Sequence, residues 1–485
     1  GSGTYISERF PGAWETDHRM CGVIGVTGVP DAARVAYLGL YSLQHRGQES
    51  GGMVAVDEAG VARSHRGMGL VSDIFNEKVL AELPGDVAIG HTRYSTAGTS
   101  VLANAQPMLA RYREGPLALA HNGNLTNAVQ LRSDLVAKGS LFQSSSDSEV
   151  LVHLIARSEA REPEDQLLDA LERVEGAYSL LITIGRTLYA IVDPRGFRPL
   201  VLGRLGRGWV VASETCALDI TGATLVRELE PGDFVRIHGE DVDQLPRLAA
   251  RPPRRCVFEL VYFSRPDSTV FHRSVDGVRR ALGRELAREH PAPGTDCVFS
   301  VPDSSNAMAL GFSEESGVKL EHALIRNHYV GRTFIHPAQA GRMAKVKIKF
   351  NPVREVLRGK KVVVVDDSIV RGTTSRALVQ LIRQAGAAEV HLRVASPPIT
   401  GPCYYGIDTP SRHELIASSS SVEQIREHLG VDTLGYLSLD GMLRAAGGEP
   451  SDFCHACFSG DYPTAIPEDL ERARNAAPLL AAIPS

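Results

Sequence analysis

The sequence has no apolar run long enough to cross a membrane. Its longest apolar stretches, such as YSLLITIG and the four valines at 362–365, have the length of β-strands, whereas a membrane helix needs about 18 or more apolar residues. The first 20 residues also lack the apolar centre of a secretory signal. We therefore expect a cytoplasmic protein that has no membrane partner.

An excess of positive charge is missing as well. Lysine and arginine number 52 against 57 aspartates and glutamates, so the formal net charge is −5. A general nucleic-acid binder would need a basic face, and we therefore expect no nucleic-acid partner. The seven cysteines are odd in number and widely scattered. In a large cytoplasmic protein this pattern favours catalysis or metal binding over disulfide bonds.

The pattern of apolar residues changes along the chain. Short apolar runs broken by Gly, Asn and Asp, with helical patterns between them, predict an α+β domain over residues 21–243. A linker rich in Pro and Arg follows at 244–255. From 256 to 465, continuous apolar strands alternate with helices and predict an α/β domain with a mostly parallel sheet. We interpret residues 466–485 as a peripheral helix or tail, and residues 1–20 as an artificial tag, a pro-segment or a wrongly assigned start.

The sharpest local signal is the stretch VVVVDDSIVRGTTS at 362–375. Four valines predict a buried strand, Asp366 and Asp367 stand at its carboxyl end, and a polar turn then opens a helix. Ligands of open parallel sheets lie beyond the carboxyl ends of strands, and a helix N-terminus binds anions. We expect the two aspartates to hold ribose hydroxyls or Mg2+. The turn that would hold a phosphate consists of Arg371, Gly372, Thr373, Thr374 and Ser375.

This stretch resembles the fingerprint of type I phosphoribosyltransferases, whose shared substrate is phosphoribosyl pyrophosphate (PRPP). Two other segments fit such a site. Asp303, Ser304 and Ser305 follow a predicted strand, where backbone and hydroxyl groups would meet pyrophosphate and its metal ion. The segment 326–351 is rich in Lys and Arg and suits a mobile loop that closes over a polyanion, with Arg332 assigned to PRPP binding. A plain solvated segment is the alternative for this loop.

Cys21 raises a separate possibility near the start of the chain. A thiol is an effective nucleophile only as the thiolate, so it needs a base or an electropositive setting. The α-amino group of Cys21 could be that base, because its pKa of about 8 leaves part of it neutral at physiological pH. This role requires removal of residues 1–20. Taken alone, the residue would be assigned as a buried structural cysteine.

Three further stretches support the catalytic interpretation. GHTRYSTAG supplies Arg93, whose guanidinium suits a carboxylate, and SSSDSE supplies Asp147, which could hold an ammonium group. AHNGNLTN supplies Asn122 and Gly123, whose side-chain amide and backbone N–H could stabilise an oxyanion. Together these stretches resemble the glutaminase domain of class II, N-terminal-nucleophile amidotransferases. The resemblance implies that Cys21 is the nucleophile, that Asn122 and Gly123 form the oxyanion hole, and that Arg93 and Asp147 bind glutamine.

Four other cysteines form a candidate metal site. Cys454 and Cys457 are spaced as C-x2-C, and Cys256 and Cys403 are distant thiols that could complete a set of four. Zinc and an iron–sulfur cluster both fit four thiolates, and the spacing does not choose between them. Cys216 and Cys297 lie in apolar surroundings, and we interpret them as core residues.

The glutaminase stretches, the PRPP element and the cysteines together resemble the glutamine phosphoribosylpyrophosphate amidotransferase family. The resemblance implies an N-terminal-nucleophile fold with four layers, αββα, and a reaction in which ammonia released from glutamine passes internally to PRPP and gives 5-phosphoribosylamine, the first committed step of purine synthesis. It also implies that the four cysteines hold a structural [4Fe-4S] cluster. The resemblance further implies that Mg2+ binds at Ser304, Asp366 and Asp367. It also implies a homotetramer and feedback inhibition by purine nucleotides.

Two other functions are weighed against this one. The first is a class II amidotransferase that serves another acceptor, such as a sugar isomerase or an asparagine synthetase domain. The stretch at 362–375 argues against it. The second is a PRPP-sensing regulator without enzymatic activity, which would leave the complete set of glutaminase stretches unexplained.

Overall fold

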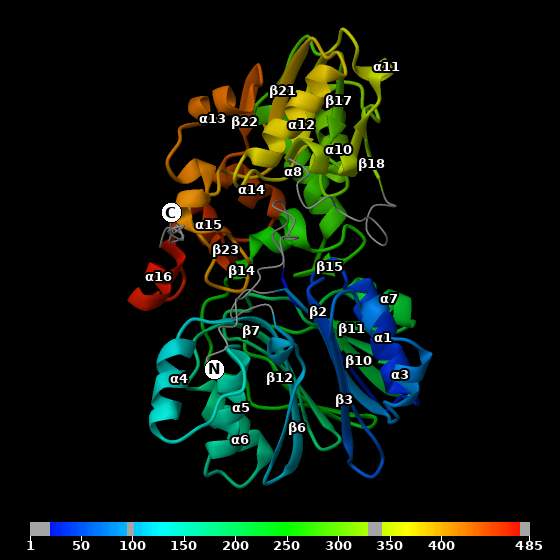
Figure 1. The fold of residues 1–485 in the computed structure, drawn as a ribbon, viewed down its shortest axis with the longest axis vertical. Coiled ribbons are helices and arrows are strands. Elements are labelled where there is room, and N and C mark those ends of the chain that lie inside the picture. The colour runs from blue at the N-terminus through cyan, green and yellow to red at the C-terminus, as the bar shows by residue number, and fades with distance from the viewer. Residues whose placement is uncertain (1–19, 95–100, 328–341, 476–485) are drawn as a thin grey trace, which may run out of the picture. The chain divides into compact units, whose positions relative to one another are not determined.

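The structure is a computed structural model, and it describes residues 20–94, 101–327 and 342–475. Contacts divide the chain into two compact units, and many of their elements are labelled in Figure 1. The larger unit comprises the described parts of residues 18–279, 400–412 and 439–485. The smaller unit comprises the described parts of residues 280–399 and 413–438. Along the sequence, the smaller unit thus lies between segments of the larger one.

The larger unit is built on two antiparallel sheets. The strands of the seven-stranded sheet, in spatial order, are β11 (Thr224–Glu228), β9 (Val201–Leu205), β10 (Gly208–Ala212), β1 (Gly22–Thr27), β4 (Val87–Arg93), β2 (Ser50–Val56) and β3 (Ala62–Met68). Those of the six-stranded sheet are β13 (Asp241–Gln244), β12 (Phe234–His238), β8 (Thr187–Val192), β7 (Gly176–Ile184), β6 (Gly115–Leu125) and β5 (Met108–Tyr112).

The two sheets pack face to face because successive residues of their strands point to opposite sides. Val23 and Ile89 of the seven-stranded sheet share a buried cluster with Leu181 of the six-stranded sheet. Their chain neighbours Ile24 and Ala88 belong to a different cluster, which lies on the outer side of the seven-stranded sheet. The same alternation that predicts strands from the sequence therefore places one apolar face between the sheets and another under the helices.

Helices cover both outer faces of this pair of sheets. The outer cluster of the seven-stranded sheet includes residues of α1 (Ala32–Ser42), α2 (Val71–Ile74), α3 (Glu77–Ala81) and α7 (Thr215–Thr221). The corresponding cluster of the six-stranded sheet includes residues of α4 (Ala128–Ala137), α5 (Ser148–Arg157) and α6 (Pro163–Leu171). The result is the four-layer αββα arrangement, so the predicted fold class of the N-terminal part is confirmed.

The smaller unit contains a four-stranded parallel sheet, as predicted for the second domain. Its strands, in spatial order, are β17 (Cys297–Ser300), β20 (Lys361–Asp366), β21 (Glu389–Val394) and β22 (Thr433–Tyr436). Helices α9 (Asn306–Ser316), α12 (Thr373–Gln384) and α13 (Val422–Leu429) alternate with these strands along the chain. The valines of β20 are buried in the core of this unit, which explains the continuous apolar run in the sequence.

The structure differs from the expected loop at 326–351. Residues 328–341, including Arg332, lie outside the described residues. The segment after them forms helix α10 (Arg342–Lys349), and β19 (Phe350–Pro352) pairs with β18 (Leu324–Arg326). Val346 and Phe350 are buried in the core of the smaller unit. The basic residues between these apolar positions hid their helical spacing from the composition-based prediction.

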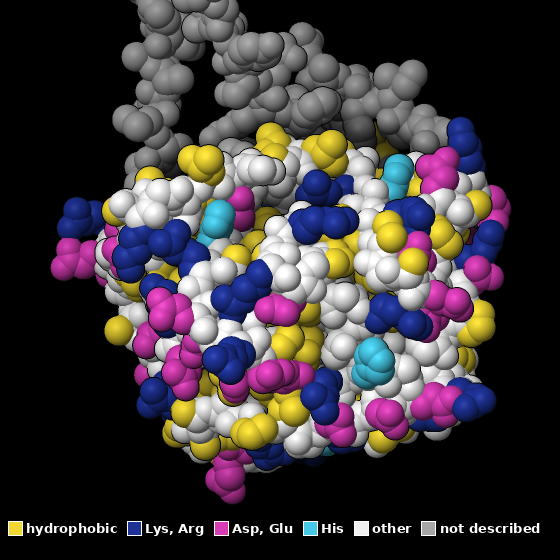
Figure 2. All heavy atoms as spheres, turned by 90° about the horizontal axis from the view of Figure 1, so that it is seen from below, with side chains coloured by type: hydrophobic (Ala, Val, Ile, Leu, Met, Phe, Trp, Pro, Cys, Tyr) yellow, Lys and Arg dark blue, Asp and Glu magenta, His cyan; other side chains and the backbone are white. Residues whose placement is uncertain are grey.

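Further elements complete the described chain. They are η1 (Leu102–Asn104), β14 (Arg255–Cys256), the π-helix η2 (Glu259–Phe263), β15 (Thr269–Val270), β16 (Arg273–Ser274), α8 (Val275–Glu289), α11 (Arg354–Leu357), η3 (Arg412–Glu414), η4 (Ile416–Ser418), α14 (Leu439–Ala446), η5 (Pro450–Asp452), β23 (Phe453–Cys454), α15 (Ala456–Ser459) and α16 (Glu468–Asn475). Among the described helices, none is long and apolar enough to cross a membrane. On the face shown in Figure 2, basic and acidic side chains are interspersed and do not gather into one basic patch.

Candidate active sites

Cys21 and Arg93 lie at the same end of two paired strands. β1 and β4 are antiparallel, with Gly22 opposite Thr92, so the residue before β1 lies near the last residue of β4. Strand β6, which carries Asn122 and Gly123, contacts both of these strands. The fold of the larger unit thus brings together three of the stretches that the sequence singles out.

The Cys21 thiol is buried and protonated at neutral pH. Its Sγ lies 3.7 Å from the carbonyl oxygen of Tyr94. Burial raises the pKa of this thiol to about 11; the charge of Arg93 lowers it, and the charges of Glu49 and Asp147 raise it. Since the thiolate is the nucleophile, the site needs a base that removes the proton during the reaction.

Residue 20 lies inside the same unit. Met20 is completely buried, and its backbone N–H donates to the carbonyl oxygen of Arg46 over 3.1 Å. With the Met20–Cys21 peptide bond intact, the nitrogen of Cys21 is an amide and cannot act as a base. The α-amino group that we expect to act as the base would become available only when this bond is cut.

These features predict how the reactivity of Cys21 depends on pH. In the chain that retains Met20, the rate of Cys21 alkylation by iodoacetamide should rise about tenfold per pH unit and level off near the thiol pKa of about 11. Removal of the preceding residues supplies the α-amino base, so the processed chain should react faster at neutral pH. Peptide mass spectrometry measures both rates, and the buried Cys216 in the same digest is the control for unfolding. Equal rates in the two forms at neutral pH would contradict the assignment of the base.

Asn122 has an unusual environment for a buried amide. The residue is completely buried, yet among the described residues neither its Nδ2 nor its Oδ1 has a hydrogen-bond partner. Leaving such a group unpaired costs about 1–3 kcal/mol, so it indicates a ligand that satisfies the amide. Gly123 follows with φ of +151°, and a Cβ atom there would lie 2.0 Å from the carbonyl oxygen of Ala177. Only glycine fits this position, because the backbone of Ala177 occupies the space that a side chain would need.

Asp147 lies just before helix α5 and is held in place by the same strand as Asn122. Its Oδ2 accepts a hydrogen bond from the backbone N–H of Leu125 over 2.9 Å. The Nδ1 atom of His121 lies 3.7 Å from that oxygen, and the hydroxyl of Ser148 lies 3.3 Å from Oδ1. These contacts fix the orientation of the Asp147 carboxylate, which is the group expected to meet a substrate ammonium.

The guanidinium of Arg93 is paired with a residue that the sequence analysis missed. Arg93 Nη1 lies 2.6 Å from Glu49 Oε1, and both side chains are largely buried. A substrate carboxylate would therefore bind to a guanidinium whose orientation is already set by an ion pair. Glu49 lies 44 residues away in the sequence, and no local pattern indicates the pairing.

In the smaller unit, the two predicted PRPP-binding segments meet at the carboxyl ends of neighbouring strands. β17 and β20 are parallel, with Ser300 opposite Val365. Just beyond, the Ser304 hydroxyl donates to Asp367 Oδ2 over 2.5 Å. Ser305 Oγ lies 3.5 Å from oxygens of both Asp366 and Asp367. The carboxylates and hydroxyls thus form one cluster of oxygen atoms.

This cluster suits a divalent cation. Burial raises the pKa of Asp366 well above its usual range, the neighbouring charge of Asp367 adds to this, and Lys349 acts in the opposite direction. A bound cation would offset the repulsion between the two adjacent carboxylates and favour their ionised forms. The donor set of carboxylate and hydroxyl oxygens is also the kind that Mg2+ prefers, so these residues fit the expected ion.

The turn after β20 has the geometry of an anion site. Gly372 has φ of +73° and immediately precedes α12, a helix of 12 residues whose first residues are Thr373, Thr374 and Ser375. Free backbone N–H groups and hydroxyls therefore meet at this helix start. Arg371 points to a carboxylate, because its Nη2 lies 2.9 Å from Glu414 Oε1. Asp303 forms an ion pair of 2.6 Å with Arg326. The sequence analysis missed both partners.

The four candidate metal-binding cysteines all belong to the larger unit. The parallel pairing of β14 with β23 sets Cys256 opposite Cys454. The carbonyl oxygen of Cys457 accepts hydrogen bonds from the N–H groups of Thr400 and Gly401, which lie just before Cys403. None of the four is in a disulfide bond.

The surroundings of these thiols suit a metal only in part. The pKa of Cys457 is raised well above its usual range by burial and by the charges of the other three cysteines, so the four sulfur atoms lie near one another. Yet in the described parts of the chain no three His, Cys, Asp or Glu side chains are already arranged to hold a metal ion. The donor chemistry therefore fits a thiolate-bound metal, and the side chains would close on it during binding.

Comparisons with known proteins agree with this pair of sites. A family model for a glutamine amidotransferase domain matches residues 91–219. Amidophosphoribosyltransferase 2, chloroplastic, from Arabidopsis thaliana is 51% identical over 456 residues, which are 94% of this chain and 81% of that protein. Amidophosphoribosyltransferase from Bacillus subtilis is 49% identical over 455 residues, which are 93% of this chain and 95% of that protein.

A solved structure agrees with the sequence comparison. Glutamine phosphoribosylpyrophosphate amidotransferase from B. subtilis, complexed with ADP and GMP, superposes with a TM-score of 0.88 at 47% identity and covers 93% of this chain and 100% of that one. Because the identity of about one half extends over nearly the whole chain, the chain belongs to the amidophosphoribosyltransferase family.

Proposed function

We propose that the protein uses glutamine and PRPP to make 5-phosphoribosylamine, pyrophosphate and glutamate, the first committed step of purine synthesis. The observation that carries the proposal is the extent of the family match. It covers 94% of the chain and so extends over both units. Either site alone would fit several kinds of enzyme.

In the first half of the reaction, the Cys21 sulfur attacks the side-chain amide of glutamine. The α-amino group of Cys21 takes the thiol proton and gives it to the departing nitrogen, which leaves as ammonia. The Nδ2 of Asn122 and the backbone N–H of Gly123 donate to the oxyanion, which is why an unpaired buried amide belongs there. Water then cleaves the thioester to glutamate and restores the thiol. Arg93 and Asp147 bind the α-carboxylate and the α-ammonium group.

In the second half, ammonia attacks the anomeric carbon of PRPP and displaces pyrophosphate. Asp366 and Asp367 hold the ribose hydroxyls, and residues 371–375 bind the 5-phosphate. Asp303, Ser304 and Ser305 lie on the pyrophosphate side. Ammonia that reached bulk water would become ammonium and lose its nucleophilicity, so its transfer requires a passage closed to solvent.

Two inorganic groups belong to this proposal. Ser304, Asp366 and Asp367 would hold Mg2+, which offsets the charge of the leaving pyrophosphate when bound. Cys256, Cys403, Cys454 and Cys457 would hold a [4Fe-4S] cluster with a structural role, which places the protein in the iron–sulfur branch of the family. Zinc is the alternative for the same four thiolates.

The regulation and assembly of the protein are also part of the proposal. The B. subtilis relative was solved in complex with ADP and GMP, and we expect purine nucleotides to inhibit this protein by feedback. A cytoplasmic homotetramer is the expected form. Arg332 would contact PRPP from the segment outside the described residues.

The coupling of the two sites is the sharpest test of the proposed function. Purified protein from which residues 1–20 have been removed is mixed with glutamine and Mg2+, with or without PRPP, and glutamate is measured. Glutamate formation should be at least about tenfold faster with PRPP, because closure over PRPP completes the site for glutamine. Ribose 5-phosphate replaces PRPP in the control and should not stimulate. Glutamate formation that ignores PRPP would contradict the proposal.

A further inference from the structure

The larger unit contains four buried charged side chains that the proposed mechanism does not use. Arg46, Arg198, Glu214 and Glu259 are each at most 1% exposed. Buried charges are costly unless they are paired and hydrogen-bonded. Here two cations face two anions, so the group is neutral as a whole.

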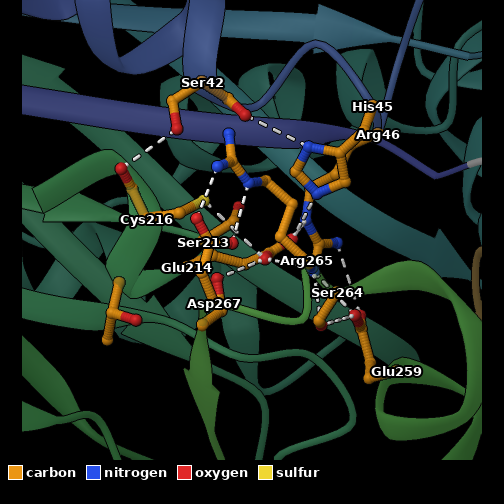
Figure 3. Close-up of polar contacts among 12 residues, drawn as sticks. Ser42, His45, Arg46, Ser213, Glu214, Cys216, Glu259, Ser264, Arg265 and Asp267 are labelled. Atoms are coloured by element: carbon orange, nitrogen blue, oxygen red, sulfur yellow. Dashed lines mark hydrogen bonds and ion pairs between the residues drawn. The ribbon is translucent and has the colours of Figure 1, made fainter. Parts of the chain in front are cut away.

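Arg46 lies at the centre of this group, between the two glutamates (Figure 3). Its Nε lies 2.6 Å from Glu214 Oε1, and its Nη2 lies 2.6 Å from Glu259 Oε2. Arg198 Nη1 contacts Glu259 Oε1 at 3.4 Å. Glu259 also accepts a hydrogen bond from the Ser264 hydroxyl over 2.9 Å. Glu259 therefore joins both guanidinium groups.

One end of the group reaches the residues on both sides of Cys21. The carbonyl oxygen of Arg46 accepts the N–H of Met20 over 3.1 Å. On the other side, a Cβ atom at Gly22 would lie 3.3 Å from the Cδ of Arg46, so the arginine side chain packs against that glycine. The contact with Gly22 does not depend on Met20 and persists when the chain before Cys21 is removed.

The other end reaches the segments that carry the cysteines. Glu259 opens the π-helix only three residues after Cys256. Arg198 donates from Nε and Nη2 to the carbonyl oxygen of Tyr405 over 3.1 and 2.6 Å. The N–H of Tyr405 in turn donates to Cys403 Sγ over 3.3 Å, and its ring stacks on Phe197 with ring centroids 4.3 Å apart.

We propose that Glu259 is a positioning residue for Cys21: through Arg46 and Arg198 it couples the placement of the nucleophile to the segments that bear Cys256 and Cys403. The inference rests on the proposed function, since it concerns the glutamine half of that reaction. A short π-helix at this point agrees with the role, because such irregular turns are frequent at functional sites. Glu259 touches no reacting atom, so its effect passes through the arginines.

The test compares Glu259→Gln with Glu228→Gln in protein from which residues 1–20 have been removed, so that Cys21 carries its α-amino group. Glu228 is another buried glutamate of the larger unit, outside this group. It accepts the N–H of His272 over 2.7 Å and serves as the matched control. Glu259→Gln should lower kcat for glutamine hydrolysis about tenfold with little change in KM, because Arg93 and Asp147 are untouched. The rate of Cys21 alkylation at neutral pH should fall together with kcat. The rate of ammonia-dependent product formation should remain at the wild-type value. Glu228→Gln should change none of these.

The link to the cysteine set is tested by a double-mutant cycle with Cys256→Ser. If Glu259 carries the coupling, the double variant should be no slower in Cys21 alkylation than the slower single variant. The same cycle built with Glu228→Gln should be additive. Visible absorption and metal content of anaerobically purified protein are recorded for every variant, so loss of a bound group is seen directly.

Several outcomes would overturn the inference. One is a kcat for Glu259→Gln within twofold of the wild type. Another is a loss of activity accompanied by alkylation of the buried Cys216, which would show general loosening. A third is additivity of the effects of Glu259→Gln and Cys256→Ser on Cys21 alkylation, which would show that the two residues are not coupled. If Glu259→Gln does not give soluble protein, Arg198→Lys is tested in its place. This variant keeps the buried positive charge but loses the guanidinium that donates from two nitrogens to Tyr405, and it should show the same slow Cys21 alkylation. A wild-type protein without PRPP-stimulated glutamine hydrolysis would instead contradict the proposed function.

Discussion

Replacing Cys21 by alanine should abolish the use of glutamine and leave the use of ammonia intact. The variant has no sulfur to form the thioester, so glutamine-dependent formation of 5-phosphoribosylamine should fall by more than about 10^4-fold. With a high concentration of ammonium salt at alkaline pH, free ammonia supplies the nucleophile directly, and the rate should stay within about twofold of wild type, because PRPP binds through residues of the smaller unit.

The measurement is product formation with each nitrogen source in turn. Cys216→Ala is the matched control, because Cys216 is also a buried cysteine of the larger unit, with its pKa raised by burial to about 12. This control should keep both activities. Loss of the ammonia reaction in Cys21→Ala would show that the proposed division of labour between the two sites is wrong.

The second large effect is expected at Asp367. Asp367→Asn should reduce the glutamine-dependent and the ammonia-dependent reactions alike, by at least about 100-fold. The substitution removes the charge that would bind the cation and replaces one acceptor oxygen by a donor. Asp367 accepts the hydroxyls of Ser304 over 2.5 Å and Ser368 over 2.6 Å, so the change also breaks up the cluster of oxygen atoms.

A control at the amino end of another strand of the same sheet distinguishes an effect on the reaction from an effect on stability. Asp432 lies at the start of β22, where it pairs with Arg383 over 2.6 Å. Asp432→Asn should lower the melting temperature somewhat but leave both reactions near the wild-type rate. If Asp367→Asn affected only the glutamine reaction, the assignment of the PRPP site would have to move elsewhere.

Elements that are marked by a local sequence pattern could be predicted well. The alternation of apolar residues gave the strands, and the stretch at 362–375 indicated a strand, a turn and a helix, which the structure shows as β20 and α12. The family and the fold class are confirmed as well. The roles of Cys21 and of the other site residues stay predictions, although the structure brings them together in the two units.

Contacts between distant segments could not be predicted. Glu49 beside Arg93, Glu414 beside Arg371 and the buried group around Arg46 are ion pairs over long sequence separations. A charged residue that ends up buried has the same sequence appearance as one on the surface, because its partner is supplied by the fold. Helix α10 was missed for a related reason, since its lysines and arginines were interpreted as part of a mobile loop that closes over a polyanion.

The order of the segments along the chain has a consequence for synthesis. Residues 400–412 and 439–485 belong to the larger unit, and β14 completes its pairing only with β23. A ribosome therefore has to make nearly the whole polypeptide before the unit with the nucleophile can close, whereas the residues of the smaller unit are all made earlier. The described residues of the smaller unit are thus all synthesised before the last segment of the larger unit, residues 439–475.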